Sequence, residues 1–416
     1  MSPRRPSYPR ATAPVRHGRL KRRGIARSIL AFAGAAIAVV LVAGVSVVAV
    51  AVGQLTTAVT THTVHLAGPK PPPGLDAIKG EVNVLVVGTD TRKDQAGFEH
   101  ELSASSGRGN NDVTILVHIA ADHQSALVVS FPRDLMVPIP SCPNPAGGSY
   151  GASSIAMLNE SLSRGGPACP VLTIEKLTGI DIPYAALVDF DGAATMADAV
   201  GGVTVCVATP IHDPNVGLDL PAGEDTISGD TARAFLRTRH GVGDGSDLGR
   251  ISNQQIYLSA LARTIKSQGV LNNPIKLFSI AKVATSSLQL SDSLGHLDTL
   301  AGIALAVKNI PLANIAMIQY PAGSSPLYPN RVVPVAGVDN LVNTALQQDQ
   351  RVQLTGSTGR GAVLSPTQSA APTSPPTSPP PSPSPSGAPA PVALPSTVQG
   401  QSADQQTCSK GVTVRG

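Results

Sequence analysis

The segment from Ser28 to Leu55 is almost entirely apolar and contains no charged residue. As a helix, a run of this length can cross the roughly 30 Å hydrocarbon layer of a bilayer. Nine arginines and lysines precede it, whereas the first acidic residue is Asp76. Cationic flanks of a membrane span stay in the cytoplasm. We therefore expect a basic cytoplasmic tail at 1–27, a transmembrane signal anchor at 28–55 and an extracytoplasmic location for everything that follows.

A cleaved signal peptide is the alternative interpretation of the same segment. Ala49-Val50-Ala51 resembles the small-residue site at which such peptides are removed. The apolar run is longer than an ordinary signal-peptide core, which favours a retained anchor in the cell membrane. Both interpretations export the rest of the chain.

The charge of the exported part argues against nucleic acid as a partner. Once the nine N-terminal cations are set aside, 22 basic residues stand against 27 acidic ones, so this part is mildly acidic. Proteins that bind nucleic acid present a basic face to it. The exported part also shows no helix-turn-helix pattern. We therefore expect no nucleic-acid partner.

The four cysteines, Cys142, Cys169, Cys206 and Cys408, fit an oxidising exterior. They form no CxxC pair and no Cys/His cluster with zinc spacing. Four cysteines allow three pairings, and the sequence leaves the choice among them open. The Pro/Gly-rich stretch that contains Cys142 and Cys169 favours a bond between these two.

Composition divides the exported part into three. Residues 56–78 form a Thr/Pro-rich stalk, residues 79–350 a folded body, and residues 351–416 a Pro/Ser/Thr-rich tail. Such a tail cannot bury enough apolar surface to offset its ordering entropy, so we expect it to be disordered.

Short β-branched runs and longer helical patterns alternate in the body, which predicts an α/β sandwich. The predicted strands are 82–88, 113–119, 126–131, 186–190, 203–207 and 315–320. The predicted helices are 172–177, 193–200, 229–236, 251–266 and 297–308.

Charged residues flank the first three predicted strands. Asp90 and Arg92 follow the first strand, Asp112 precedes the second, and Arg133 follows the third. In α/β sheets, residues at strand ends line the ligand crevice. An aspartate at such a place can instead cap a turn or a helix, which is the alternative at each position taken alone.

A second cluster surrounds the Gly/Asp-rich stretch 241–247. It consists of Arg237, Arg239, Arg250 and Gln254. Guanidinium groups match phosphate oxygens in pairs, and a helix that begins near Ile251 would add backbone N–H donors for an anion. The alternative is a salt-bridged surface in which the arginines pair with Asp134, Asp244 and Asp247.

Two carboxylates with several arginines are the composition of a Mg²⁺-assisted phosphoryl-transfer site. Carboxylate oxygens hold the metal, and guanidinium groups stabilise charge that develops in the transition state. The motifs of serine hydrolases, zinc proteases, β-lactamases and P-loop enzymes are absent from the sequence.

Taken together, these segments resemble the LytR-CpsA-Psr family of bacterial envelope enzymes, in the form found in high-GC Gram-positive bacteria. The resemblance covers about residues 80–270 in order. Its segments are Asn83–Arg92, Asn111-Asp112, Val128–Asp134, Leu158-Asn159, Gly165-Gly166, Leu177–Ile180, Val188–Phe190, Ala199–Val203, Phe235–His240, Asp247–Arg250 and Gln254-Gln255.

The resemblance implies one transmembrane helix and an extracytoplasmic α-β-α sandwich with a central mixed sheet. It implies Mg²⁺ or Mn²⁺ as cofactor, a polyprenyl pyrophosphate-linked glycopolymer as donor and peptidoglycan as acceptor. The reaction is a phosphotransfer that joins the two and releases polyprenyl phosphate, with a pyrophosphatase side activity. The lipid tail would lie in an apolar channel of the domain.

The resemblance also assigns roles. Asp90 and Asp112 would hold the metal, and together with Arg133 and Arg250 they would be the catalytic residues. The residues that would bind the pyrophosphate are Arg92, Arg133, Arg237, Arg239, Arg250 and Gln254.

Three departures from the family pattern support a different function. Many members have cationic side chains where this chain has Asn110, Met157 and Asn253. Their loss favours a catalytically silent wall-binding scaffold, whereas the presence of Asp90, Asp112, Arg133 and Arg250 opposes it. A third alternative is a transcriptional attenuator, which could act only indirectly from outside the membrane.

Overall fold

The computed structural model describes residues 63–64, 66, 80–91, 109–144, 147–267, 269, 273–366 and 390–412. The predicted cytoplasmic tail and membrane anchor, and most of the stalk, lie outside these ranges. None of the helices within them combines the length and the apolar composition that a bilayer crossing requires.

A mixed eight-stranded sheet forms the centre of the fold, as the resemblance implied. In spatial order its strands are β1 (Thr63–Val64), β14 (Leu288–Ser291), β9 (Tyr184–Val188), β2 (Val82–Thr89), β3 (Asn111–Ile119), β4 (Ala126–Phe131), β15 (Ile315–Gln319) and β21 (Gly400–Ser402). Parallel pairs join β1 to β14, β9 to β2 and β4 to β15, while the other neighbours are antiparallel.

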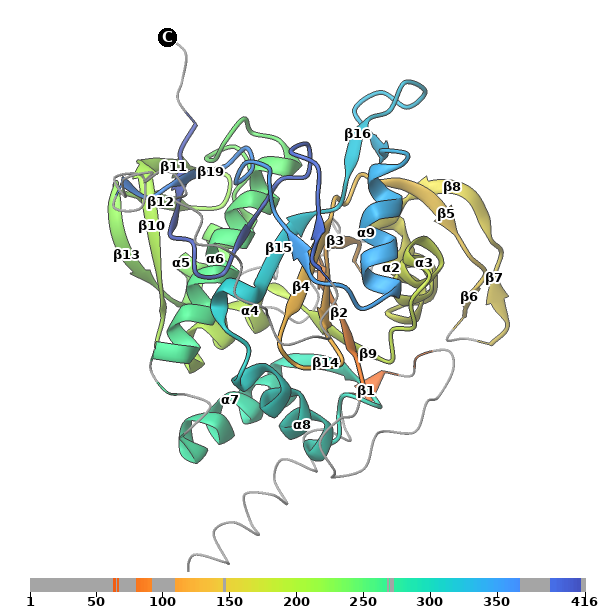
Figure 1. Cartoon of the computed structure of the whole chain (residues 1–416), viewed down its shortest axis with the longest axis horizontal. Coiled ribbons are helices and arrows are strands. Elements are labelled where there is room, and N and C mark those ends of the chain that lie inside the picture. The colour runs from red at the N-terminus through yellow and green to blue at the C-terminus, as the bar shows by residue number, and fades with distance from the viewer. Residues whose placement is uncertain are drawn as a thin grey trace, which may run out of the picture. The chain divides into compact units, whose positions relative to one another are not determined.

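Eight described helices accompany the sheet. They are α2 (Ser161–Gly165), α3 (Ala168–Thr178), α4 (Phe190–Ala199), α5 (Gly229–Arg237), α6 (Asp247–Ser267), α7 (Pro274–Ser287), α8 (Leu297–Lys308) and α9 (Val338–Gln347). Helices α2, α3 and α9 lie on one side of the sheet, α4, α5 and α6 lie on the other, and α7 and α8 lie beside β14 (Figure 1).

Strand β4 carries apolar side chains on both of its faces, which explains why the sheet needs a helical layer on each face. Leu127, Val129 and Phe131 point into one apolar cluster, whereas Ala126 and Val128 point into another. Successive side chains of a strand face opposite sides, so a strand buried on both faces reads as a continuous apolar run.

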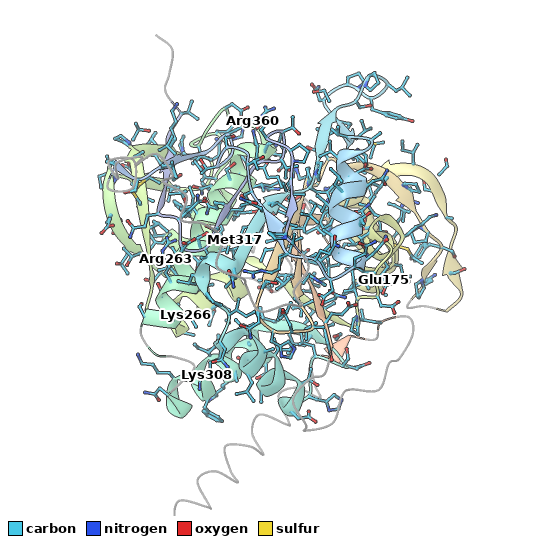
Figure 2. The ribbon with its side chains drawn as sticks, viewed as in Figure 1. Glu175, Arg263, Lys266, Lys308, Met317 and Arg360 are labelled. Carbon is cyan, nitrogen blue, oxygen red and sulfur yellow. A yellow bond between two sulfur atoms is a disulfide. The ribbon has the colours of Figure 1, made fainter. Side chains whose placement is uncertain are left out.

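Each face of the sheet has its own core. The first core adds Ile174 of α3 and Val342 of α9. The second adds Ala306 of α8 and packs against Leu258 of α6, with Met317 of β15 inside it (Figure 2). The fold is therefore an α-β-α sandwich, in agreement with the prediction.

A second, four-stranded sheet lies beyond α4, α5 and α6. Its strands are β13 (Gly223–Ile227), β10 (Val203–Thr209), β22 (Thr407–Lys410) and β19 (Ala362–Leu364). Val205 of β10 packs with Phe235 of α5 and Tyr257 of α6 in a third core. Helix α6 thus contacts both sheets and connects the two parts of the structure.

Two-stranded ribbons complete the fold. They are β5 (Met136–Ile139) with β8 (Ser153–Met157), β6 (Cys142–Pro143) with β7 (Ser149–Tyr150), β11 (Ile211–Asp213) with β12 (Leu218–Leu220), β16 (Ala322–Ser324) with β17 (Val332–Pro334), and β18 (Val352–Gln353) with β20 (Val392–Ala393). Two short 3₁₀ turns lie at Leu158–Glu160 and Leu312–Asn314.

The prediction of a disordered tail at 351–416 is wrong for its described parts. Residues 351–366 and 390–412 supply β18 to β22, including a strand of each main sheet. The central strand β22 pairs with β10 and β19, so tertiary contacts give it the order that its composition does not predict. The predicted stalk likewise contributes β1, which pairs with β14.

The predicted strand at 186–190 also needs correction. Strand β9 ends at Val188, and α4 begins at Phe190. Asp189 between them is the helix N-cap, because its carboxylate accepts a hydrogen bond from the Gly192 amide at 2.7 Å.

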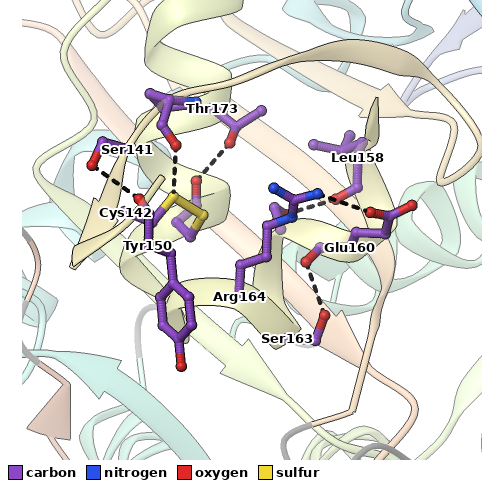
Figure 3. The surroundings of a disulfide bond; sticks show 11 residues. Ser141, Cys142, Tyr150, Leu158, Glu160, Ser163, Arg164 and Thr173 are labelled. Atoms are coloured by element: carbon purple, nitrogen blue, oxygen red, sulfur yellow. Dashed lines mark hydrogen bonds and ion pairs between the residues drawn. A yellow bond between two sulfur atoms is a disulfide. The ribbon is translucent and has the colours of Figure 1, made fainter. Parts of the chain in front are cut away.

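Both disulfides are formed. The favoured Cys142–Cys169 bond is confirmed, and it joins β6 to α3 (Figure 3). The second bond, Cys206–Cys408, joins β10 to β22 across 202 residues. Because all three cores and both bonds lie within one compact unit, Leu55–Gly416, we expect this part to fold without the residues before it.

Candidate functional site

A cavity of about 560 Å³ opens between the central sheet and helices α4 to α7. This volume is typical of pockets for small molecules and cofactors. Seven of the eight predicted site residues line it: Asp90, Asp112, Arg133, Arg237, Arg239, Arg250 and Gln254. The eighth, Arg92, lies outside the described residues.

Strand pairing explains why residues distant in sequence meet at the cavity. Strands β2 and β3 are antiparallel, with Thr89 opposite Asn111, so Asp90 after β2 lies near Asp112 at the start of β3. Strand β4 is antiparallel to β3, which brings the end of β4, and with it Arg133, to the same edge. The predicted clustering at this sheet edge is confirmed.

Asp112 connects two of the arginines. Its Oδ1 accepts a hydrogen bond from Arg133 Nη1 at 2.8 Å, and its Oδ2 lies 3.7 Å from Arg250 Nη1. Arg250 Nη2 also donates to the backbone oxygen of Asp112 at 2.6 Å and lies 2.7 Å from Asp247 Oδ1. Arg250 is 5% exposed, so this network holds it rigidly at the cavity wall.

The arginines differ in their electrostatic surroundings. Burial lowers the pKa of Arg133, but Asp112, Asp247 and Asp134 raise it by more, so the net shift is upward. Burial also lowers the pKa of Arg239, and the like charges of Arg133 and Arg250 lower it further. Within the described residues, Arg239 has no carboxylate at ion-pair distance.

Three buried guanidinium donors have no acceptor within the described part of the chain. They are the Nε atoms of Arg133, Arg239 and Arg250. Leaving a buried charged donor unpaired costs roughly 1–3 kcal/mol or more, so such donors usually meet a ligand or water. An anion with several oxygens, such as pyrophosphate, supplies the acceptors that these groups lack.

The salt-bridged surface that was the alternative is only partly found. Arg133 and Arg250 do pair with Asp247, and Arg133 Nε lies 3.9 Å from Asp134 Oδ2. Arg133 and Arg250 line a cavity, however, and Asp244 pairs instead with Arg360 at 2.8 Å.

Asp213 positions the loop that carries Arg239. Its Oδ2 accepts hydrogen bonds from Thr238 Oγ1 at 2.7 Å and from the amides of Arg239 and Gly241 at 3.3 Å each. The side chain of Asp213 acts through this loop and does not line the cavity. The sequence gives no signal for this role, because Asp213 lies 25 residues before Thr238 in a separate hairpin.

Two further residues complete the charged end of the cavity. The Arg237 guanidinium lies 4.1 Å from the ring centroid of Phe190, which fits a cation–π contact. Arg233, which was not predicted, lines the cavity from α5 and pairs with Asp191 at 3.3 Å and Asp230 at 2.9 Å.

Helix α6 lines the cavity from its charged end to its apolar end. Arg250 and Gln254 come first, followed by Tyr257, Leu261 and Ile265 on the same side. At about 1.5 Å per residue, Ile265 lies roughly 22 Å along the helix from Arg250. Burial raises the pKa of Tyr257 to about 12, so its phenol is neutral. The rest of the apolar wall includes Ile115, Met196, Val200, Leu258, Ile280 and Leu288.

The carboxylates at the charged end fit the ligand chemistry of Mg²⁺. Mg²⁺ is usually held by one or two carboxylates together with phosphate oxygens and water, and Asp90 and Asp112 both line the cavity. Asp90 is held in place by the backbone and side-chain amides of Asn110. Gly109 has a φ of +75°, and a Cβ there would collide with Thr89 Oγ1, so the chain passes close to Asp90.

The three departures from the family pattern occupy different surroundings. Asn110 bonds to Asp90 and therefore belongs to the site. Asn253 is fully buried in α6 and donates to the Phe235 carbonyl at 2.6 Å. Met157 pairs with Met136 in the β5–β8 ribbon. Asn110 is thus the departure that hydrogen-bonds to a cavity-lining residue.

A model of the LytR_cpsA_psr family matches residues 49–351, so the chain belongs to that family. The chain is similar to the cell wall biosynthesis protein LcpA of Corynebacterium glutamicum, with 31% identity over 317 residues that cover 70% of this chain and 60% of LcpA. It is 31% identical to the probable cell wall biosynthesis protein LcpB of the same organism over 243 residues, which cover 56% of this chain and 55% of LcpB. The chain thus spans 55–60% of the length of these two relatives.

Solved structures share the fold. TagV from Bacillus subtilis aligns with a TM-score of 0.52 and 23% identity, covering 65% of this chain and 98% of TagV. A LytR-Csp2A-Psr enzyme from Actinomyces oris aligns with a TM-score of 0.50 and 22% identity, covering 69% of this chain and 94% of that enzyme. At these identities the likeness shows the α/β fold.

Proposed function

We propose that this chain is a phosphotransferase of cell-wall assembly, which moves a glycopolymer from a polyprenyl pyrophosphate carrier to peptidoglycan. We place residues 28–55 in the cell membrane as a single anchor, with the folded unit outside. Family membership and the cell-wall names of the Corynebacterium relatives support a role in wall assembly.

One observation carries the proposal. A single cavity joins a cationic end, where Arg133, Arg239 and Arg250 leave buried donors unpaired, to an apolar end. A ligand that fills both ends must combine several anionic oxygens with a long hydrocarbon chain. A polyprenyl pyrophosphate has this structure, because its diphosphate is joined directly to its lipid.

The proposed reaction is a displacement at phosphorus. A sugar hydroxyl of peptidoglycan attacks the phosphorus that carries the glycopolymer, and a new O–P bond forms. The bond from that phosphorus to the bridging oxygen breaks, and polyprenyl phosphate leaves with the electron pair. The hydroxyl proton passes to water at the mouth of the cavity. Attack by water instead would give the pyrophosphatase side reaction.

The residues at the charged end have distinct parts in this step. Arg133 and Arg250 are fixed by Asp112, so their remaining donors are aimed before the substrate arrives. Such preorganised donors stabilise the charge that grows on the leaving oxygen. Asp90 and Asp112 would hold Mg²⁺ or Mn²⁺, which when bound neutralises phosphate charge.

The test uses the folded unit Leu55–Gly416 with a polyprenyl pyrophosphate and Mg²⁺, and follows the phosphate-containing products. We expect turnover that falls at least about 100-fold in Arg133→Ala, as is usual when one transition-state donor is removed. Asp90→Ala should lose the metal-dependent turnover. Arg164→Ala is the matched control, because Arg164 pairs with Glu160 on α2 and does not line the cavity.

Each other outcome selects a different function. Lipid binding without turnover, in the wild type and at every metal concentration, would establish a silent binder and identify Asn110 as the first residue to restore to a cation. Neither binding nor turnover would overturn the proposal. An attenuator that acts through transcription would show unchanged wall composition when Arg133→Ala replaces the wild type in cells.

A further inference from the structure

The lysines of the described part are unevenly distributed. Six are present, and four of them, Lys266, Lys276, Lys282 and Lys308, lie between the end of α6 and the end of α8. Within residues 262–314 five cations stand against two carboxylates, Asp292 and Asp298. The exported part as a whole has the opposite balance, so this segment is a basic region on an acidic protein.

The basic region has a defined place in the fold. Lys276 and Lys282 are exposed on α7, while Lys266 and Lys308 are half-buried near the ends of α6 and α8. Lys266 and Lys308 lie at the end of the molecule formed by α7 and α8 (Figure 2). Lys266 donates to the Ile310 carbonyl, which holds the end of α6 against the turn after α8.

The same elements form the apolar end of the cavity. Ile265 of α6, Ile280 of α7 and Leu288 at the start of β14 all line it. The cationic end lies at the opposite end of α6, roughly 22 Å away at about 1.5 Å per residue. Lys266 directly follows Ile265, and Lys276 and Lys282 share α7 with Ile280, so these lysines lie on the helices that form the apolar end of the cavity.

The chain also enters the folded unit at this end. Strand β1 pairs with β14, with Thr63 opposite Leu290. Only seven residues separate Thr63 from Leu55, where the proposed anchor ends. At most about 3.6 Å per residue, they hold β1 within roughly 29 Å of the membrane surface. Strand β14 lies between α7 and α8 in sequence, so the basic region adjoins the strand at which this short tether meets the folded unit.

We propose that α7, the end of α6 and the end of α8 form a docking surface for an anionic lipid bilayer. Lys276 and Lys282 contact the lipid headgroups, and Lys266 and Lys308 add to the local potential. Each lysine close to an anionic membrane contributes about 1 kcal/mol of attraction. Docking places the apolar end of the cavity directly at the bilayer, so a polyprenyl chain passes from lipid to protein without crossing water.

The test measures how the Leu55–Gly416 unit binds vesicles by flotation, which removes the anchor from the comparison. Vesicles of phosphatidylcholine alone are compared with vesicles that contain phosphatidylglycerol. We expect binding only to the anionic vesicles, and weaker binding as salt rises because the charges are screened. The double variant Lys276→Gln/Lys282→Gln should weaken binding roughly 30-fold, which corresponds to about 1 kcal/mol per lysine.

A matched control removes the same charge elsewhere. Lys176→Gln/Lys410→Gln changes two exposed lysines on α3 and β22 and should bind like the wild type. Equal weakening in both double variants, binding that ignores lipid charge, or no binding to anionic vesicles would overturn the proposal. Turnover of a short, soluble prenyl pyrophosphate should be unchanged in Lys276→Gln/Lys282→Gln, so this result is independent of the proposed chemistry.

Discussion

Of the three arginines with an unpaired Nε, Arg239 is the one without a carboxylate at ion-pair distance among the described residues. It is half-buried, and its pKa is lowered by burial and by the like charges of Arg133 and Arg250. Its Nε has no acceptor among the described residues. An arginine in these surroundings costs stability in the free protein and gains it back when an anion binds, which is the usual conflict between stability and function.

Replacing Arg239 by Met is therefore expected to stabilise the ligand-free protein, whereas most mutations destabilise a protein. Arg239→Met should raise the unfolding free energy of the ligand-free unit by about 1 kcal/mol, because it removes a repelled charge and keeps the aliphatic stem. Inorganic pyrophosphate should stabilise the wild type through binding linkage, and this stabilisation should disappear in the variant. Denaturant unfolding with and without pyrophosphate measures both effects.

Arg133→Met is the informative comparison. Arg133 is paired with Asp112 and lies near Asp247 and Asp134, so its removal leaves carboxylates uncompensated and should destabilise the free protein. If both variants shift the unfolding free energy in the same direction, the difference in carboxylate pairing between Arg133 and Arg239 does not govern their stability.

At the scale of elements, the last described strand, β22, supports the site. The carbonyl of Lys410 accepts a hydrogen bond from the Gly243 amide at 2.9 Å, and the Val412 amide donates to the Gly241 carbonyl at 3.0 Å. Strand β22 thus continues into contacts with the loop between Arg239 and Arg250. The segment that composition assigns to a mobile tail fixes the loop that holds the cationic end of the cavity.

Truncation after residue 366 should consequently damage both stability and activity. It removes β20, β21 and β22, and with Cys408 it removes a cross-link whose 202-residue closure corresponds to about 5 kcal/mol in the chain-entropy account. Replacing residues 370–385 by a Gly/Ser segment of equal length should leave both unchanged, because a segment composed of Pro, Ser, Thr and Ala has little apolar surface to bury. Denaturant unfolding and the turnover assay compare the two variants. Equal loss of stability and turnover in both variants would show that the removal of β22 is not the cause.

Sequence patterns predicted the elements that carry their own signal. The strands near 82–88, 113–119 and 126–131 were predicted because β-branched apolar runs mark a sheet buried on both faces. Strand β22, Thr407–Lys410, has no such run. It is a strand because β10 and β19 pair with it on either side, and pairing partners are a property of the tertiary structure.

The site was predictable to a similar degree. Asp90, Asp112 and Arg133 follow from charges at strand ends, and the family resemblance added the roles of Arg239 and Arg250. Asp213 was missed, because its function is to accept hydrogen bonds from a loop 25 residues away. Such a contact depends on how the β11–β12 hairpin folds against α5, which no local pattern encodes.

Across the whole molecule, the directions of the aspartate pKa shifts predict how stability changes in acid. Burial raises the pKa of Asp213, Asp244 and Asp349, but the hydrogen bonds that they accept lower it by more, so each is lowered on balance. Burial raises the pKa of Asp189. A carboxylate whose pKa is lowered by folding stabilises the fold above its unfolded-state pKa of about 4. This contribution is lost as the pH falls through its folded-state pKa.

We therefore expect the unfolding free energy of Leu55–Gly416 to fall as pH decreases below about 4, with Asp189 opposing the trend. Asp213→Asn should make this fall shallower and should lower stability at pH 7 by about 1–3 kcal/mol. Asp219→Asn, on the partner strand of the same hairpin, is the control, because its side chain is 83% exposed. Denaturant titrations from pH 3 to 7 measure both. A parallel pH dependence in Asp213→Asn and the wild type would contradict the assignment.

The position of β22 between β10 and β19 also fixes the order in which an exported chain can mature. A chain exported behind its N-terminal anchor presents β10 outside about 200 residues before β22 follows it. Until then β10 has an open edge, Cys206 has no partner, and the loop beside Arg239 lacks its support. The cationic end of the cavity is thus completed only when the last part of the chain has crossed the membrane. A chain whose export stops before that point would have no activity.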